Sequence, residues 1–198
     1  MPATLSTIMI SGTSHVGKST LAGLLSAKLH CEAISTDSLA RHPGRPWPGI
    51  PAPVTEYYTQ LSAETIHWFL KVHHQNIWPL IRALIDSKTG TGKPVIFEGS
   101  ALRPELMAPL LGSTVAGVFL HAENDFLLGR MRAQAGYDDA TAGERRIMDA
   151  FIERSLRENT EMLASAREHH LAIVDIANPD ALDSLVNDLA ARAAGSPA

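Results

Sequence analysis

The sequence has 198 residues, of which 45% are hydrophobic, and a formal net charge of −4. This length allows one domain with a buried core, and the acidic balance excludes a broad basic field for wrapping nucleic acid, which leaves room only for a local groove. The single cysteine, Cys31, excludes an internal disulfide. No apolar stretch is long enough to span a bilayer, and the first residues lack the basic segment of a secretory signal. We therefore expect one soluble, cytoplasmic domain over residues 1–198.

The first expected elements are a strand over Ser6–Ser11 and a helix over Lys18–His30. The loop between them has the pattern G-x-x-x-x-G-K-[ST], in which backbone N–H groups and the start of the helix bind a polyphosphate. Lys18 should contact the β- and γ-phosphates, and Ser19 should hold Mg²⁺. The pattern predicts a nucleoside triphosphate site, with ATP and Mg²⁺ as cofactors, formed by Gly12, Thr13, Ser14, His15, Val16, Gly17, Lys18, Ser19 and Thr20.

The expected second strand, Glu32–Thr36, is followed directly by Asp37. Carboxyl ends of parallel strands face the ligand crevice of an open α/β sheet. A carboxylate there can accept a proton from an alcohol that attacks the γ-phosphate. The alternative is that Asp37 caps a helix, as its neighbours Ser35, Thr36 and Ser38 also could.

Residues 42–53 contain five prolines, which predicts a stiff extended segment. This segment is either a surface connector or the rim of an acceptor pocket, to which Arg41, Arg45 and Trp47 would contribute. With the helical pattern that follows, it makes 38–90 the expected acceptor-binding region.

A long helical pattern covers 62–88 and contains Pro79. A proline inside a helix removes a hydrogen bond and clashes with the preceding turn, so we expect a kink or break near Asn76–Trp78. The large aromatic side chains of this region are expected in the core: Trp68, Phe69 and Trp78.

The expected third strand, Pro94–Glu98, ends in a second carboxylate. Glu98 is expected to hold Mg²⁺ through water or to orient the acceptor; the alternative is a structural hydrogen bond to the phosphate-binding loop. Gly99 permits a ligand to approach the backbone closely. Arg103 would pair with an anionic acceptor or be a solvated loop arginine.

A fourth strand is expected over Thr114–His121, followed by a helix over 124–134 that carries Arg130 and Arg132. Guanidinium groups on a closing segment can stabilise the charge of a phosphoryl group in transfer, so 124–145 is the expected lid. The alternative is a solvated helix face, and Arg145 and Arg146 are further candidates for the same role.

The remaining expected elements are a helix over 143–168, a strand over His170–Ala177 and a helix over 180–193. Thr141 and Glu144 have the spacing of a capping box. The alternation of strands and helices predicts a parallel sheet with helices on both faces, and each strand reads as buried on both sides.

With these motifs in this order, the chain resembles the P-loop small-molecule kinases, such as adenylate, shikimate and gluconate kinases and chloramphenicol phosphotransferase. Ser35–Asp37 with Arg41 also resembles the corresponding region of polynucleotide 5′-hydroxyl kinases. The resemblance implies an α/β fold of three layers (αβα) with a five-stranded parallel sheet in the order 2-3-1-4-5 and a helical acceptor and lid insertion. It places the acceptor hydroxyl at Asp37 and ATP near Arg130 and Arg132.

The sequence departs from these families in the loop interior, Thr13–Val16, which lacks the extra glycine common in adenylate kinases. We expect an ATP-dependent kinase that moves the γ-phosphate to a hydroxyl of a small molecule, acting without nucleic acid or membrane. The alternatives are a regulatory P-loop ATPase and a polynucleotide or nucleoside 5′-hydroxyl kinase. The sequence identifies neither the acceptor nor the oligomeric state.

Overall fold

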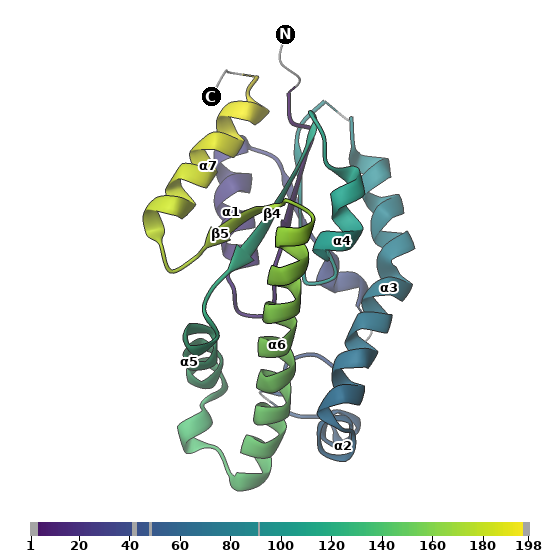
Figure 1. Ribbon diagram of the computed structural model, residues 1–198, viewed down its shortest axis with the longest axis vertical. Helices are drawn as coiled ribbons and strands as arrows, with labels where there is room; N and C mark the ends of the chain where they lie inside the picture. The colour runs from purple at the N-terminus through teal and green to yellow at the C-terminus, as the bar shows by residue number, and fades with distance from the viewer. Residues whose placement is uncertain (1–3, 41–42, 48, 91, 196–198) are drawn as a thin grey trace.

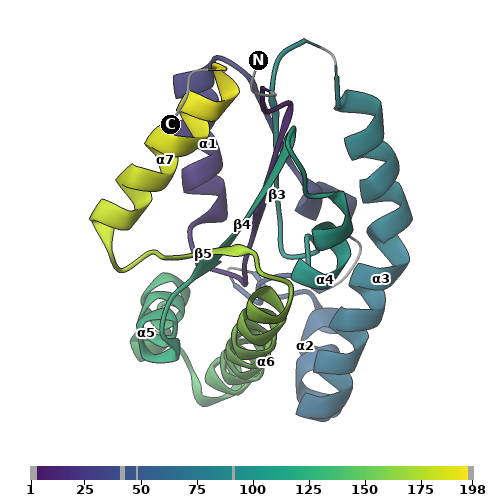
Figure 2. The same ribbon diagram turned by 45° about the horizontal axis from the view of Figure 1, so that its top comes forward.

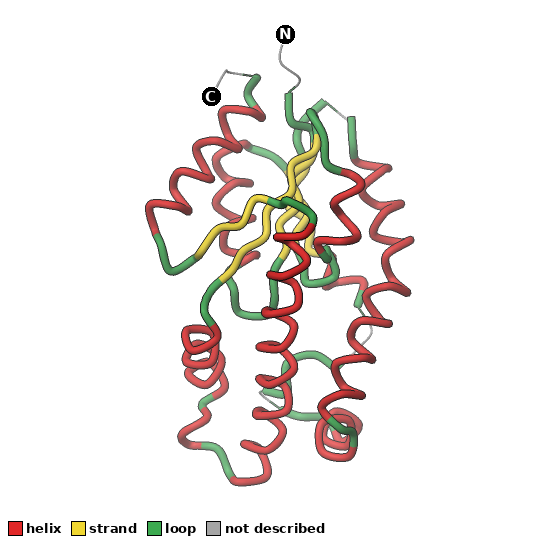
Figure 3. The backbone as a smooth tube through the Cα atoms, viewed as in Figure 1, coloured by secondary structure: helices red, strands yellow, loops and turns green. Residues whose placement is uncertain are grey.

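A five-stranded parallel sheet forms the centre of the computed structural model, which describes residues 4–40, 43–47, 49–90 and 92–195 (Figure 3). The strand order is β2-β3-β1-β4-β5, as expected. The strands are β1 (Thr7–Ser11), β2 (Glu32–Ser35), β3 (Val95–Glu98), β4 (Val115–His121) and β5 (Ala172–Asp175). The register pairs Ile10 with Glu98 and Glu98 with Ser35, so the carboxyl ends of three strands lie side by side.

Helices cover both faces of this sheet, which confirms the three-layer architecture. Figure 2 shows α1 and α7 on one side of the sheet and α3 and α4 on the other. The helices are α1 (Lys18–Leu29), α2 (Ala52–Gln60), α3 (Ala63–Lys88), α4 (Pro104–Met107), α5 (Asn124–Ala135), α6 (Ala142–Glu168) and α7 (Pro179–Ala193). Short 3₁₀ turns occur at Thr36–Leu39, Ala108–Leu110 and Tyr137–Asp139.

The core is divided in two by the sheet because successive strand residues point to opposite faces. In β1, Ile8 and Ile10 belong to one buried cluster, and Met9 belongs to the other. The two edge strands differ from the expectation that every strand is buried on both sides. Every residue of β2 and β5 is at least partly exposed, because an edge strand has a neighbour on one side only. None of the helices in the described part of the chain has the length and apolar character needed to cross a membrane.

Helix α3 corrects the expected break near Pro79 and the expected burial of two aromatic side chains. The helix continues through Pro79 without a break, because its apolar stripe, including Ile77 and Ile81, packs into the core on both sides of the proline. Trp68 is not a core residue, since 60% of it is exposed, and 37% of Phe69 is exposed. Trp78 packs partly against the core, as expected.

Several helical segments extend beyond the carboxyl ends of the strands, at the opposite end of the molecule from the two termini (Figure 1). They are α2, α5 and the first turns of α6. The capping box expected at the start of α6 is present: Thr141 Oγ1 accepts from Glu144 N at 3.4 Å, and Glu144 Oε2 accepts from Thr141 N at 2.8 Å. These segments and the strand ends enclose the candidate site.

Candidate functional site

The phosphate-binding loop joins β1 to α1, and two of its glycines are required by its shape. A Cβ atom on Gly12 would lie 2.7 Å from Val16 Cγ1 and 2.8 Å from Leu120 O, which is too close for any side chain. Gly17 has φ +92° and caps α1, so Lys18 is the first residue of the helix. The backbone N–H groups at the start of α1 therefore face the loop, as a polyphosphate site requires.

Lys18 lies across this loop with only 7% of the residue exposed. Its Nζ donates a 2.9 Å hydrogen bond to Thr13 O, and Thr13 Oγ1 donates at 2.9 Å to Ser155 O on α6. The lysine cation is thus held at the loop by the backbone of the loop itself. This places a positive charge where the outer phosphates of a bound nucleotide would lie.

Ser19 and Glu98 meet beside the loop and fit a bound Mg²⁺. Ser19 Oγ donates a 3.1 Å hydrogen bond to Glu98 Oε1, whereas the buried Glu98 Oε2 has no partner. An unpartnered buried carboxylate oxygen is costly, and hydroxyl and carboxylate oxygens are the ligands that Mg²⁺ prefers. Both sequence-based interpretations of Glu98 thus have a basis, since it bonds to the loop and keeps one oxygen available.

Asp37 is fixed at the end of β2 by the turn that follows β3. Its Oδ1 accepts hydrogen bonds from Ser100 N at 3.3 Å and Ser100 Oγ at 3.5 Å. The turn can approach because Gly99 has no side chain: a Cβ there would lie 2.0 Å from Thr36 Oγ1 and 3.1 Å from Asp37 Oδ1. The N-cap of the short 3₁₀ helix is Ser35, so Asp37 is not the cap.

One cavity of about 440 Å³ joins these groups. Its wall combines the phosphate-binding loop, the turn around Asp37, and side chains from α5 and α6. The lining residues are Ser14, His15, Gly17, Lys18, Ser19, Thr20, Asp37, Ala40, Gly44, Arg45, Leu70, Ser100, Arg130, Gln134, Phe151, Arg154 and Glu158. The cavity thus contains the expected phosphate site and the expected acceptor carboxylate.

Comparison with known proteins gives no match to a protein-family model and no match to a curated protein. Solved structures do match. A gluconokinase from Sinorhizobium meliloti 1021 is 22% identical, with a TM-score of 0.55 over 98% of this chain and 93% of that one. A sugar kinase from Janibacter sp. HTCC2649 is 19% identical, with a TM-score of 0.56 over 98% and 99%. A shikimate kinase from Aquifex aeolicus is 19% identical, with a TM-score of 0.50 over 96% and 99%. The chain has the fold of the P-loop small-molecule kinases.

Within this P-loop kinase fold, the two arginines expected in the lid, Arg130 and Arg132, lie in different places. Arg130 lines the cavity, whereas Arg132 lies over the ring of Tyr137, with its guanidinium carbon 4.6 Å from the ring centroid. Arg145 also contacts Tyr137, through its ring and its carbonyl oxygen. Arg41, expected at the acceptor pocket, lies outside the described residues.

Arg103 is neither solvated nor part of the cavity wall. The residue is 4% exposed and pairs with Glu105 at 2.5 Å and with Glu158 at 3.2 Å. Its partner Glu158 does line the cavity. Arg103 therefore acts on the site through the carboxylate that it holds.

Two cavity residues on α6, Arg154 and Glu158, were missed by the sequence analysis. Arg154 is 6% exposed, and its Nη1 donates a hydrogen bond to Tyr58 Oη at 3.1 Å. Its guanidinium carbon lies 4.5 Å from the centroid of the Phe151 ring, and its Nε has no hydrogen-bond partner. None of the carboxylates in the described residues forms an ion pair with Arg154. The signal that was present is periodicity: both residues continue, at helical spacing, the apolar stripe that contains Phe151.

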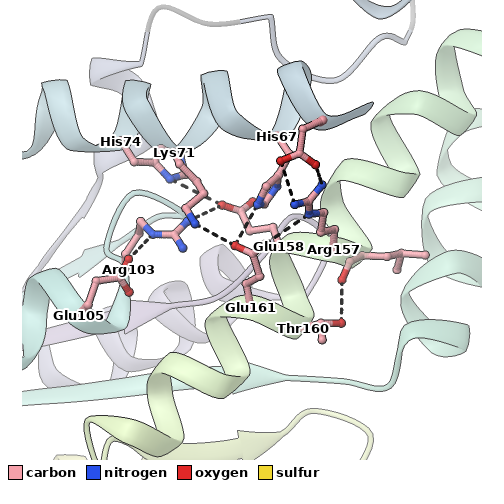
Figure 4. A network of polar contacts seen from close by, with 11 residues as sticks. His67, Lys71, His74, Arg103, Glu105, Arg157, Glu158, Thr160 and Glu161 are labelled. Carbon is pink, nitrogen blue, oxygen red and sulfur yellow. Dashed lines mark hydrogen bonds and ion pairs between the residues drawn. The ribbon is translucent and has the colours of Figure 1, made fainter. Parts of the chain in front are cut away.

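A polar network behind the cavity joins α3 to α6 (Figure 4). Glu158 contacts Arg103 and lies 3.6 Å from His74 Nδ1, and burial raises its pKa while Arg103 opposes the rise. Near it, Glu161 contacts His67 at 2.9 Å and Lys71 at 3.1 Å. Burial opposes ionisation of Glu161, but these two contacts outweigh it and lower its pKa to about 2. The network fixes Glu158 at the cavity wall.

Proposed function

We propose that this protein is an ATP- and Mg²⁺-dependent phosphotransferase that moves the γ-phosphate of ATP to a hydroxyl group of a small molecule. The observation that carries the proposal is that Lys18 of the phosphate-binding loop and the Asp37 carboxylate line the same cavity. A cavity of this size, about 440 Å³, is in the range of small-molecule sites. The similarity of the fold to a gluconokinase, a sugar kinase and a shikimate kinase supports the same reaction class.

In this proposal the loop amides and Lys18 bind the β- and γ-phosphates, and Arg130 stabilises the charge that spreads over the transferring group. Asp37 accepts a hydrogen bond from the acceptor hydroxyl, orients its oxygen toward the γ-phosphate and takes up its proton. Ser19 and Glu98 would hold Mg²⁺, which neutralises phosphate charge when bound. Most of the rate enhancement comes from positioning and electrostatics, because phosphoryl transfer needs little other protein chemistry.

The acceptor in this proposal carries an anionic group. Arg154 supports this, because its buried guanidinium is in direct contact with none of the described carboxylates and its Nε is available to an anionic ligand. Asp37, on the same wall, is suited to a hydroxyl group, since a carboxylate oxygen accepts hydrogen bonds. A hydroxylated carboxylic acid or phosphate ester satisfies these groups together.

The test is an ADP-release screen over hydroxy acids, sugars, sugar phosphates, nucleosides, antibiotics and oligonucleotides, with the variant Lys18→Ala as the blank. The expected result is ADP release that depends on one class of acceptor, with the phosphorylated product seen by mass spectrometry. ATP hydrolysis that no acceptor stimulates would contradict the proposal and favour a regulatory ATPase. Activity confined to oligonucleotides would favour the 5′-hydroxyl kinase alternative.

A further inference from the structure

The loop residue His15 combines a left-handed backbone conformation with side-chain contacts to several other segments. Its φ is +66°, a left-handed conformation that is uncommon outside glycine, although histidine adopts it more often than most residues. His15 stands in the loop interior that lacks the extra glycine. Strain of this kind persists only where surrounding contacts enforce it, and it concentrates at functional sites.

Those contacts come from both nitrogens of the imidazole. Nε2 bonds to Gln134 Oε1 on α5, and Nδ1 lies 2.9 Å from Ser14 Oγ. Arg45 Nη1 donates to the same Gln134 Oε1 at 3.4 Å. Because a guanidinium only donates, this contact fixes which end of the Gln134 amide faces His15. His15 Nε2 therefore carries the hydrogen, and Nδ1 accepts from the Ser14 hydroxyl.

The imidazole also packs against aromatic rings from two other segments. Its centroid lies 5.7 Å from that of Trp47 and 6.2 Å from that of Phe151. Burial, followed by the charges of Arg45, Lys18 and Arg130, lowers the pKa of His15 to about 4, so the ring is neutral near pH 7. His15 thus connects the phosphate-binding loop to α5, to residues 43–47 and to α6.

These connections determine where two cavity arginines lie. Arg130 precedes Gln134 by one helical turn, so both lie on the same face of α5, and both line the cavity. The Arg130 guanidinium carbon lies 5.7 Å from the centroid of the Phe126 ring on the same helix. The placement of Arg130 over the loop therefore depends on the placement of α5. Arg45 is held through the same Gln134 oxygen.

We propose that His15 is a positioning residue that ties α5 and the 43–47 segment to the phosphate-binding loop and so holds Arg130 and Arg45 over the bound triphosphate. This inference rests on the proposed kinase function. It assigns to the His15 side chain no contact with phosphate, which the loop amides and Lys18 bind. It differs from a merely structural role because removing the His15 side chain should lower kcat through the displacement of Arg130.

The kinetic test compares His15→Ala, Arg130→Ala and the double variant, using an acceptor found in the screen. His15→Ala should lower kcat by about 10- to 100-fold, with KM for ATP within about threefold, because misplacing a charged group by an ångström costs that much. In the Arg130→Ala background the same change should have an effect of under about threefold, because the group that it positions is gone. His15→Gln, which can still donate to Gln134, should recover most of the rate. Full multiplication of the two single effects would overturn the proposal.

The second test does not depend on activity. Hydrogen exchange measured with ADP and Mg²⁺ present should show faster exchange in the last turn of α5 and in 43–47 for His15→Ala and for Gln134→Ala. The control is His170→Ala, an exposed histidine that also has a positive φ, +54°. If the wild-type protein transfers no phosphate, the proposed function is wrong, but hydrogen exchange still tests whether His15 holds α5 and residues 43–47 to the loop. If exchange in both segments matches the wild type in both variants, the proposal is wrong.

Discussion

Ser19, the second residue of α1, donates a 3.1 Å hydrogen bond to Glu98, the last residue of β3. The contact joins residues 79 positions apart in the sequence, and it leaves the buried Glu98 Oε2 without a partner. A hydroxyl group and an available carboxylate oxygen thus lie together beside the phosphate-binding loop. This pair underlies the proposed Mg²⁺ site.

Glu98→Gln should weaken the use of Mg²⁺. The amide keeps the size of the carboxylate but loses its charge, so the Mg²⁺ concentration for half-maximal activity should rise by about 10- to 100-fold. ATP binding measured by calorimetry in EDTA should not change. The control is Glu123→Gln, whose carboxylate is exposed. An unaltered Mg²⁺ dependence of the Glu98 variant would remove Glu98 from this role.

Asp37→Asn should separate nucleotide binding from transfer. The variant retains an oxygen that can accept from Ser100 but cannot take up a proton from the acceptor. We expect an unchanged Kd for Mg·ATP and a kcat lower by about 10²- to 10⁴-fold. Ser100→Ala, which keeps the backbone N–H that contacts Asp37, should retain most activity. Near-normal turnover of Asp37→Asn would refute the catalytic role.

Arg154→Met should lower acceptor affinity without lowering stability. Methionine fills much of the same space, and replacing a buried charge that no carboxylate contacts directly by an apolar side chain is often neutral or stabilising. The free energy of unfolding in urea should therefore equal or exceed that of the wild type. KM for an anionic acceptor should rise by about 10- to 100-fold, the worth of a charge-assisted hydrogen bond. A destabilised variant with normal KM would make Arg154 a structural residue.

Gly99→Ala and Gly23→Ala should have opposite effects on stability. A Cβ on Gly99 would meet Thr36 Oγ1 at 2.0 Å, whereas one on Gly23 in α1 would meet no atom within 4 Å. We expect Gly99→Ala to destabilise by about 1–3 kcal/mol and to reduce activity by moving Asp37. Gly23→Ala should stabilise by about 0.5–1 kcal/mol. Equal urea midpoints for the two variants would contradict this account of the turn.

The lowered pKa of His15 predicts a pH-dependent stability. The folded protein holds His15 neutral down to about pH 4, whereas the unfolded chain binds a proton below about pH 6.5. The unfolded state therefore binds more protons between these values, and the contribution of His15 to stability falls as the pH drops from 6.5 to 4. His15→Gln lacks this titration, so its urea midpoint should fall less than that of the wild type over this range. Parallel pH curves would contradict the assigned pKa.

The sequence determined the parts of the site that depend on local backbone chemistry. The pattern from Gly12 to Ser19 specifies a loop whose amides and helix start bind anions wherever it occurs. The positions of Asp37 and Glu98 followed from the rule that parallel strands end at one edge of a sheet. The strand order also agreed with the resemblance on which it was based.

Only the tertiary structure decided which charged side chains enter the cavity. The sequence suggested Arg103 and Arg132 for the site and gave no reason to choose Arg154. Packing placed Arg154 at the cavity, buried Arg103 against Glu158 and positioned Arg132 over the ring of Tyr137. The continuity of α3 through Pro79 was decided in the same way, by core contacts on either side. Local rules act through neighbours in the chain, whereas burial and ion pairing depend on residues that only the folded chain brings together. For this reason the sequence predicts the phosphate-binding loop and Asp37, but not the other charged side chains around the acceptor.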